Sequence, residues 1–313
     1  MEKLSECFTL AWPKASRTTL WLLRLMLPIS LAVTLLQHYG IIAWVAQYLD
    51  PIFVLMGLPG RSAVAFLTGA FVTTYAGLAV MTSLALTLRE ATIVAIMICI
   101  CHAMVLESTV VRKTGSSFWK MAVLRFIMAF VAGAYLNLVL PAMDTPFVQS
   151  ATADAQSLAA LLQTWAWSSA QMGVMILAII YALMVTQHLM EWYGMIEKLS
   201  RLLEPLMTVF GLPRRTAYMW VVGNVLGISY GSAVMLDMEE SGIITREEAN
   251  AVNYHLVMNH SMLEDTLVFA SLGVGAGWIL STRLLFALAV VWGRRGVNTL
   301  CRRRCRAAGR APS

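Results

Sequence analysis

The sequence predicts an all-α integral membrane protein made of two inverted repeats, each with transmembrane helices, an interfacial helix and a glycine-broken re-entrant hairpin. Hydrophobic residues make up 59% of its 313 residues and charged residues 13%, whereas soluble domains have roughly 45 to 50% apolar and 25% charged residues. A fifteen-residue stretch recurs at an offset of 154 residues with seven identities. Lysine and arginine gather in only some of the segments between the apolar runs. The composition predicts the class, the recurring stretch predicts the repeat, and the charge distribution predicts the inversion.

The first apolar run, residues 18–36, follows a charged segment at the start of the chain. It is too long for the core of a signal peptide and lacks a small-residue cleavage site, so we expect a retained transmembrane helix. A membrane helix needs about 20 apolar residues, and on this basis we expect six crossings. They are residues 18–37, 90–111, 118–140, 165–187, 248–272 and 275–293.

Two further apolar segments have an amphipathic pattern. Residues 41–56 place their apolar side chains at helical spacing, with Gln47 and Asp50 elsewhere on the helical wheel. Residues 195–210 repeat this design with four charged side chains on the polar face, which are too many for a spanning segment. We therefore expect both segments to be helices that lie in the membrane interface.

A repeated turn follows each amphipathic segment, in that residues 57–61 match residues 211–215. The apolar segments that come next, 61–88 and 214–238, are interrupted by glycine, hydroxyl and tyrosine residues. They could be full crossings or re-entrant hairpins. As crossings, they would put Lys198 and its basic neighbours opposite the arginine-rich tail, against the positive-inside rule. Charge therefore favours two hairpins.

Hairpins leave an odd number of crossings in each unit, which inverts the second unit relative to the first, as in many transporters. Both termini are then cytoplasmic, and only Arg61 and Arg89 lie on the wrong side. We expect a multi-pass protein of the bacterial cytoplasmic (inner) membrane. Its parts are a cytoplasmic N-terminal segment (1–17), a first repeat (18–140), an extracytoplasmic linker (141–164), a second repeat (165–293) and a basic cytoplasmic tail (294–313).

One otherwise apolar run, residues 254–266, contains two histidines, an asparagine and two carboxylates. A charge at the bilayer centre costs about 2.5 to 3.5 kcal/mol on insertion scales, so such a cluster predicts a functional site. The first half has a counterpart in which Glu107 pairs with Glu264. His260 and Glu264 are one helical turn apart and can touch. His102 and Glu107 would converge only if the helix unwinds between them.

The paired Gly-Leu-Pro-x-Arg turns, the glycine-broken hairpins and the run from His260 to Thr266 resemble the Gate, or nucleoside-recognition, family. Its relatives are the spore maturation proteins A and B, the membrane portion of ferrous-iron transporters and the concentrative nucleoside transporters. In the nucleoside carriers the ligand lies between hairpin tips and partly unwound helices. The resemblance implies substrate-binding or ion-binding positions at Thr73, Thr74, Tyr75, His102, Glu107, Ser108, Asn224, Ser229, Tyr230, Asn259, His260, Glu264 and Asp265.

Two departures from these relatives bear on the cargo. The first hairpin tip, Thr73 to Tyr75, lacks the amide and carboxylate residues that would hold a nucleobase. The chain also lacks the phosphate-binding loop of a GTP-binding domain. We therefore expect the ion-coupled movement of a small polar solute or ion across the lipid bilayer, with a proton or sodium as the coupling ion.

Other functions stay open. A non-transporting assembly or partner subunit, as a homo-oligomer or with another membrane protein, could have the same fold. Divalent metal transport would use histidine, carboxylate and the nearby Cys99 and Cys101 as donors, although no spacing matches a known metal motif and the ligand set is unknown. We expect no enzyme activity, because His-Glu-x-x-His is absent. We also expect no cofactor. A nucleic-acid partner is not expected either, because a basic tail beside a membrane helix usually marks the cytoplasmic side.

Overall fold

The computed structural model describes residues 2–147 and 157–307. Every secondary-structure element assigned within these ranges is a helix. The first half contains α1 (Glu2–His38), α2 (Ile41–Phe53), η1 (Val54–Met56), α3 (Ser62–Phe71), α4 (Thr74–Ser83), α5 (Leu88–Ile100), α6 (Met104–Lys113) and α7 (Phe118–Val139). The second half contains α8 (Leu158–Trp192), α9 (Met195–Val209), η2 (Arg214–Thr216), α10 (Ala217–Val225), α11 (Ile228–Glu240), α12 (Arg246–Asn259), α13 (Met262–Ala270) and α14 (Ala276–Ala307). The prediction of an all-α protein is therefore confirmed.

Five helical segments in the described part of the chain are long and apolar enough to cross a membrane. They are Phe8–His38, Leu88–Lys113, Phe118–Val139, Leu158–Trp192 and Ala276–Leu300. Each overlaps one predicted crossing, and together they make this a multi-pass membrane protein. The sixth predicted crossing, 248–272, is not among them. It comprises α12 and α13 and carries the polar residues of the predicted site.

The two predicted hairpins are pairs of short helices, α3 with α4 and α10 with α11, that pack against each other. Glycines let the two arms approach closely. A Cβ atom added to Gly77 would lie 2.8 Å from the Cα of Gly69, and one added to Gly231 would lie 2.9 Å from the Cα of Gly223. Real Cβ atoms do not come that near to backbone atoms, so the close approach of the arms requires glycine at positions 77 and 231.

The hairpin tips use different residues to turn the chain. Thr73 begins α4 as its N-cap, and its hydroxyl accepts a hydrogen bond from the backbone N–H of Ala76 at 3.1 Å. This is the usual way for a threonine to satisfy a free donor at the start of a helix. Gly227 precedes α11 with a φ of 92°, a conformation that glycine adopts at no steric cost.

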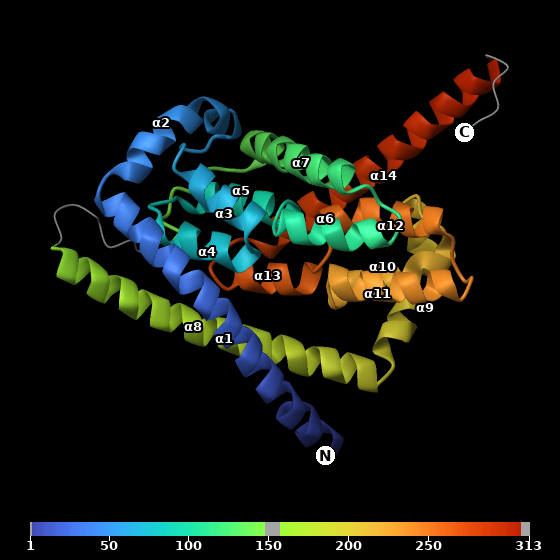
Figure 1. Ribbon diagram of the computed structural model, residues 1–313, viewed down its shortest axis with the longest axis horizontal. Coiled ribbons are helices and arrows are strands. Elements are labelled where there is room, and N and C mark those ends of the chain that lie inside the picture. The colour runs from blue at the N-terminus through green and yellow to red at the C-terminus, as the bar shows by residue number, and fades with distance from the viewer. Residues whose placement is uncertain (1, 148–156, 308–313) are drawn as a thin grey trace.

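The amphipathic helices α2 and α9 lie at opposite ends of the molecule, α2 on the left and α9 on the right in Figure 1. Each begins after a glycine in the left-handed conformation, Gly40 or Gly194. Trp44 and Tyr48 of α2 are exposed, as expected of aromatic side chains at the level of the lipid headgroups.

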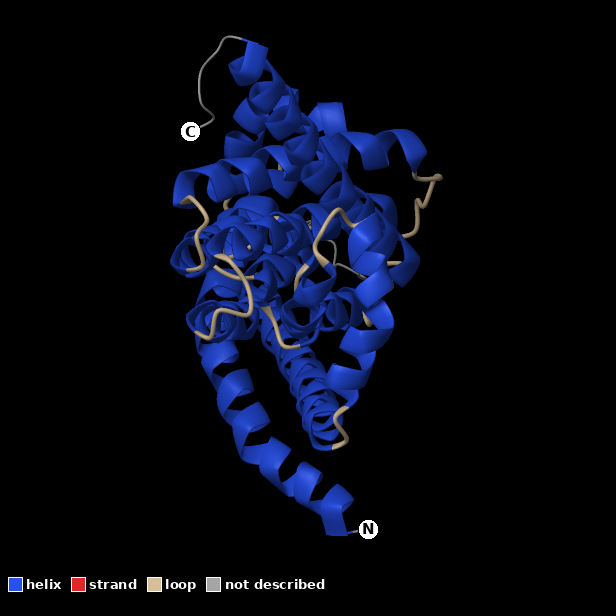
Figure 2. Cartoon of the chain, turned by 90° about the vertical axis from the view of Figure 1, so that its right-hand side faces the viewer, coloured by secondary structure: helices blue, strands red, loops and turns tan. Residues whose placement is uncertain are grey.

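The long helices α1 and α8 cross each other along the lower side of the molecule (Figure 1). Figure 2 shows them below the densely packed body that the shorter helices form. Inside that body, α5 is buried along almost its whole length and contacts α3, α4, α7, α12 and α14. The predicted site residues on α6, α12 and α13 therefore lie next to the most deeply buried helix.

Candidate functional site

Two helices break inside the packed body. The chain leaves α5 at Ile100 and resumes in α6 at Met104, and it leaves α12 at Asn259 and resumes in α13 at Met262. Each break contains a non-glycine residue with positive φ, Ala103 at 40° and Ser261 at 51°. Such conformations are strained and persist only where the surroundings hold them.

The hairpins hold both breaks in place. The backbone N–H of Ala103 donates to the carbonyl of Gly69 at 3.1 Å, and that of Ser261 donates to the carbonyl of Gly223 at 3.2 Å. These carbonyls belong to the two residues whose Cα atoms Gly77 and Gly231 approach. Close packing of each hairpin and unwinding of the neighbouring helix are therefore parts of one local structure.

A fully buried arginine satisfies the carbonyls that each break leaves free. Arg125 of α7 donates from Nε to the carbonyl of Ile100 and from Nη2 to that of His102, both at 2.9 Å. Its Nη2 also lies 2.7 Å from Oε2 of Glu107. A broken helix at membrane depth needs such partners because no water can replace its lost backbone hydrogen bonds.

Arg283 of α14 repeats this arrangement in the second half. It donates to the carbonyls of Met258 and His260, and its Nη1 lies 2.9 Å from Oδ2 of Asp265. Asp265 is therefore the counterpart of Glu107. The equivalence expected from the sequence, Glu107 with Glu264, is wrong by one residue.

His102, Glu107 and His260 converge on one buried point. The Nε2 atoms of the two histidines are 3.2 Å apart, and each lies 3.1 Å from Oε1 of Glu107. The three side chains have at most 8% of their surface exposed. We call this group the central triad; the first half contributes two of its members and the second half contributes one.

Backbone carbonyls fix both histidine rings. Nδ1 of His102 lies 3.0 Å from the carbonyl of Ile98, and Nδ1 of His260 lies 2.8 Å from the carbonyl of Leu256. A carbonyl oxygen can only accept a hydrogen bond, so each Nδ1 carries the hydrogen. In a neutral ring, Nε2 then presents a lone pair to the centre of the triad.

A family model for nucleoside recognition (Gate) matches residues 19–118. The chain is also 30% identical over 295 residues to the uncharacterized membrane protein YvoD of Bacillus subtilis (strain 168), with 90% of this chain and 94% of the relative covered. The chain belongs to the nucleoside-recognition (Gate) family. No solved structure matches it.

This Gate protein has a second polar contact between its halves beside the triad. The hydroxyl of Tyr75, in the first hairpin, donates to Oε1 of Glu264 at 2.8 Å. The expected pairing of His260 with Glu264 is replaced, because the helix breaks between them and His260 turns toward Glu107. By contrast, His102 and Glu107 meet as expected for an unwound helix.

The other predicted residues of the Gate protein divide into three groups: four are buried, one caps a helix and two are exposed. Thr74, Ser108, Asn224 and Asn259 are buried, and both amide atoms of Asn259 and the hydroxyl of Ser108 have no protein partner. Unpaired polar atoms at such depth call for a water or a bound solute. Thr73 is used as a helix cap.

Ser229 and Tyr230 do not join the triad. Both are exposed, and the ring of Tyr230 lies 6.0 Å from Nζ of Lys14. Residues 227–231 spell Gly-x-Ser-x-Gly, but here Ser229 follows helix α10 and lies in the first turn of α11. A nucleophile elbow requires a strand before the serine, so these residues do not form one.

Arg125 and Arg283 are site residues that the sequence analysis missed. Each is a single arginine within a predicted crossing, at an offset of 158 residues. An isolated charge in a membrane segment indicates a functional or paired group, and this signal was available. Their offset differs by one residue from that between Glu107 and Glu264, so extending this predicted pairing would not match the two arginines with each other.

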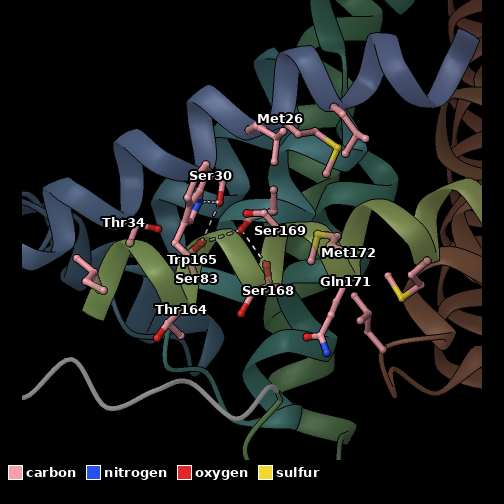
Figure 3. A pocket seen from close by; sticks show the side chains of 17 residues that line it. Met26, Ser30, Thr34, Ser83, Thr164, Trp165, Ser168, Ser169, Gln171 and Met172 are labelled. Carbon is pink, nitrogen blue, oxygen red and sulfur yellow. Dashed lines mark hydrogen bonds between the residues drawn. The ribbon is translucent and has the colours of Figure 1, made fainter. Parts of the chain in front are cut away.

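A separate cavity of about 290 Å³ lies between α1, α4 and α8 (Figure 3). Its polar lining consists of uncharged hydroxyl, amide and indole groups. Trp165 donates to the hydroxyl of Ser30 at 3.2 Å, and that hydroxyl is 3.4 Å from the hydroxyl of Ser83. None of the thirteen predicted site residues lines this cavity, so it is distinct from the central triad.

Proposed function

We propose that this Gate protein is a membrane transporter, in which a small polar solute or ion crosses through the central triad under the drive of an ion gradient. The observation that carries the proposal is that His102 and Glu107 from one half meet His260 from the other inside a multi-pass membrane protein. Buried ionisable groups in membrane segments are costly, and they are typical of transport pathways.

Alternating access follows from the division of the triad between two units. The closed arrangement seen here corresponds to an occluded state, because all three side chains are buried. A movement of α12 and α13 relative to α5 and α6 would separate His260 from Glu107 and open the site. Transporters built from repeats commonly work by such rocking around a midplane site.

The positions of α2 and α9 support an inverted arrangement. They occupy opposite ends of the molecule in Figure 1, as expected if one interfacial helix lies at each membrane surface. With the charge distribution, this supports six crossings, cytoplasmic termini and an extracytoplasmic 141–164 segment. It also supports placement in the bacterial inner membrane, where lysine and arginine mark the cytoplasmic side.

The proposal is tested with purified protein in sealed liposomes under an imposed proton or sodium gradient. A thermal-shift screen of nucleosides, organic anions and divalent metals first selects solutes, because a ligand that binds only the native state raises its melting temperature. Gradient-driven uptake of a selected solute supports transport. No uptake, together with stable co-purification of another membrane protein, would instead support a non-transporting partner subunit.

A further inference from the structure

We infer that the central triad is a binding site for a divalent transition-metal cation, with Nε2 of His102, Nε2 of His260 and Oε1 of Glu107 as its three protein ligands. This inference rests on the proposed function in one respect, because it names the class of ion that the transporter would carry. The coordination itself is argued from the side chains alone.

The first argument is the convergence of three electron-pair donors. Both Nδ1 atoms are used as donors to backbone carbonyls, so neutral rings present only lone pairs at Nε2. These lone pairs and the Glu107 carboxylate face one another at 3.1 to 3.2 Å. A proton can join only two of these three atoms by a hydrogen bond and leaves the lone pairs of the third facing them. A metal ion, in contrast, can be bound by all three atoms.

The second argument is the size of the triangle. Metal–nitrogen bonds of about 2.0 to 2.1 Å place neighbouring ligands of a tetrahedral ion about 3.3 Å apart, and those of an octahedral ion about 2.9 Å apart. The observed edges of 3.1 to 3.2 Å lie between these values. An ion about 1 Å out of the plane of the three atoms would have ordinary bond lengths to each of them.

The donor types select the class of ion. Two imidazoles and one carboxylate suit Zn²⁺ and ferrous iron, whereas Mg²⁺ and Ca²⁺ prefer sites made only of oxygen. Structural zinc sites have four protein ligands, whereas catalytic zinc sites have three and keep the fourth position open for a water or substrate. Three protein ligands at the triad therefore fit a cation that must enter and leave.

Outer contacts orient every ligand. The carbonyls of Ile98 and Leu256 hold the two imidazoles. Arg125 forms an ion pair with Oε2 of Glu107, so that Oε1 is directed at the histidines. Metal-binding histidines nearly always have such a partner at the second nitrogen, and the partner raises the basicity of the ligand.

The origin of the ligands in two halves gives the site a means of release. His260 is the only ligand from the second half, so a relative movement of the halves leaves two ligands and a lower affinity. An ion that binds the occluded arrangement more tightly would favour that arrangement by its differential affinity. Metal occupancy would thus be coupled to the conformation of the transporter.

The test measures metal binding without transport. The purified full-length protein is stripped with a chelator, loaded with Zn²⁺ or Co²⁺ and analysed for bound metal and by X-ray absorption. We expect one equivalent of metal per chain, with nitrogen and oxygen ligands at about 2.0 to 2.1 Å. His102→Gln, His260→Gln and Glu107→Gln should each weaken binding by more than the roughly 10- to 100-fold that loss of an outer partner costs.

His188→Gln is the matched control, because His188 lies on α8 outside the triad and should keep full binding. Melting temperatures show whether each variant is folded, and the X-ray absorption of the unaltered protein gives an answer even if one variant is not. Absence of a metal equivalent in the folded wild type would overturn the inference, as would unchanged binding in folded His102→Gln and His260→Gln.

The outcomes also separate this inference from the proposed function. Metal bound at the triad without gradient-driven flux in liposomes would contradict transport and leave the metal site in place. Flux of a solute by a protein that binds no Zn²⁺ or Co²⁺ would support transport and exclude the metal. Flux of the metal itself that His260→Gln abolishes would support both.

Discussion

Arg125 and Arg283 make the same set of contacts 158 residues apart, each joining two carbonyls of a broken helix to one carboxylate. The carboxylates differ, because Glu107 is one methylene longer than Asp265. Glu107 can therefore reach its arginine with one oxygen and the histidines with the other. The two halves thus form one triad, to which Glu107 contributes, whereas Asp265 forms the ion pair with Arg283.

The first prediction concerns the buried ion pair of the second half. Arg283→Met should lower the free energy of unfolding by about 3 to 5 kcal/mol, because it leaves a buried carboxylate without its partner. The double variant with Asp265→Asn should recover part of this loss. Unfolding in mixed micelles measures both values. The exposed Arg201→Met is the control and should lie within about 0.5 kcal/mol of wild type; an equally small effect of Arg283→Met would contradict the ion pair.

The second prediction concerns hairpin packing. Gly231→Ala should destabilise the protein by about 1 to 3 kcal/mol, the usual range for overpacking, since the new Cβ would lie 2.9 Å from the Cα of Gly223. Gly293→Ala, also within a helix, has no atom within 4 Å of its new Cβ and should be neutral or slightly stabilising. Thermal unfolding of both variants is the measurement. Equal melting temperatures would mean that the arms can separate without cost.

Much of the fold could be predicted because apolar length, amphipathic spacing and charge are local signals. They correctly predicted the helical class, the membrane location and both helix pairs of the hairpins. The sequence predicted that His102 and Glu107 meet only if the helix unwinds between them, since residues five apart in an intact helix do not meet. The position of a break could not be derived, because distant carbonyls and arginines hold the strained residues Ala103 and Ser261.

The site was harder to predict than the fold. His102 and His260 are 158 residues apart, and only their packing shows that their Nε2 atoms meet. Each hairpin tip contains a tyrosine in the sequence, yet Tyr230 is exposed whereas Tyr75 is buried. The two hairpins have unequal surroundings, because α1 packs against α4 of the first hairpin, whereas the second tip meets Lys14 near the start of α1. A repeat in sequence therefore does not guarantee a repeat in exposure.

The third prediction concerns topology. Asp144 and Lys198 are both exposed, and the charge distribution predicts that Asp144 lies outside the cell and Lys198 in the cytoplasm. Cysteine introduced at Asp144, in a background without the five native cysteines, should react with an impermeant thiol reagent in whole cells. Cysteine at Lys198 should react only after the membrane is opened. Labelling of Lys198→Cys but not Asp144→Cys in intact cells would reject the inverted arrangement.

The last prediction concerns Glu264, whose Oε1 accepts a hydrogen bond from the Tyr75 hydroxyl at 2.8 Å across the two halves. We expect Glu264 to bind the coupling ion. It follows His260 of the triad by four residues, and within the described residues no ion pair joins it to an arginine, whereas Glu107 and Asp265 each have one. Glu264→Gln should abolish ion-coupled uptake and change the melting temperature little, because the amide oxygen can still accept from Tyr75 but the group cannot ionise.

Uptake in liposomes and thermal unfolding are measured side by side for Glu264→Gln, Tyr75→Phe and the exposed control Glu240→Gln. Tyr75→Phe removes only the hydrogen bond and should cost about 0.5 to 1.5 kcal/mol of stability while coupled uptake persists. Glu240→Gln should match wild type in both assays. If Glu264→Gln transports normally, the carboxylate does not carry the coupling ion. If it fails to fold while Tyr75→Phe folds, the carboxylate of Glu264 is a structural tie between the halves and not the group that binds the coupling ion.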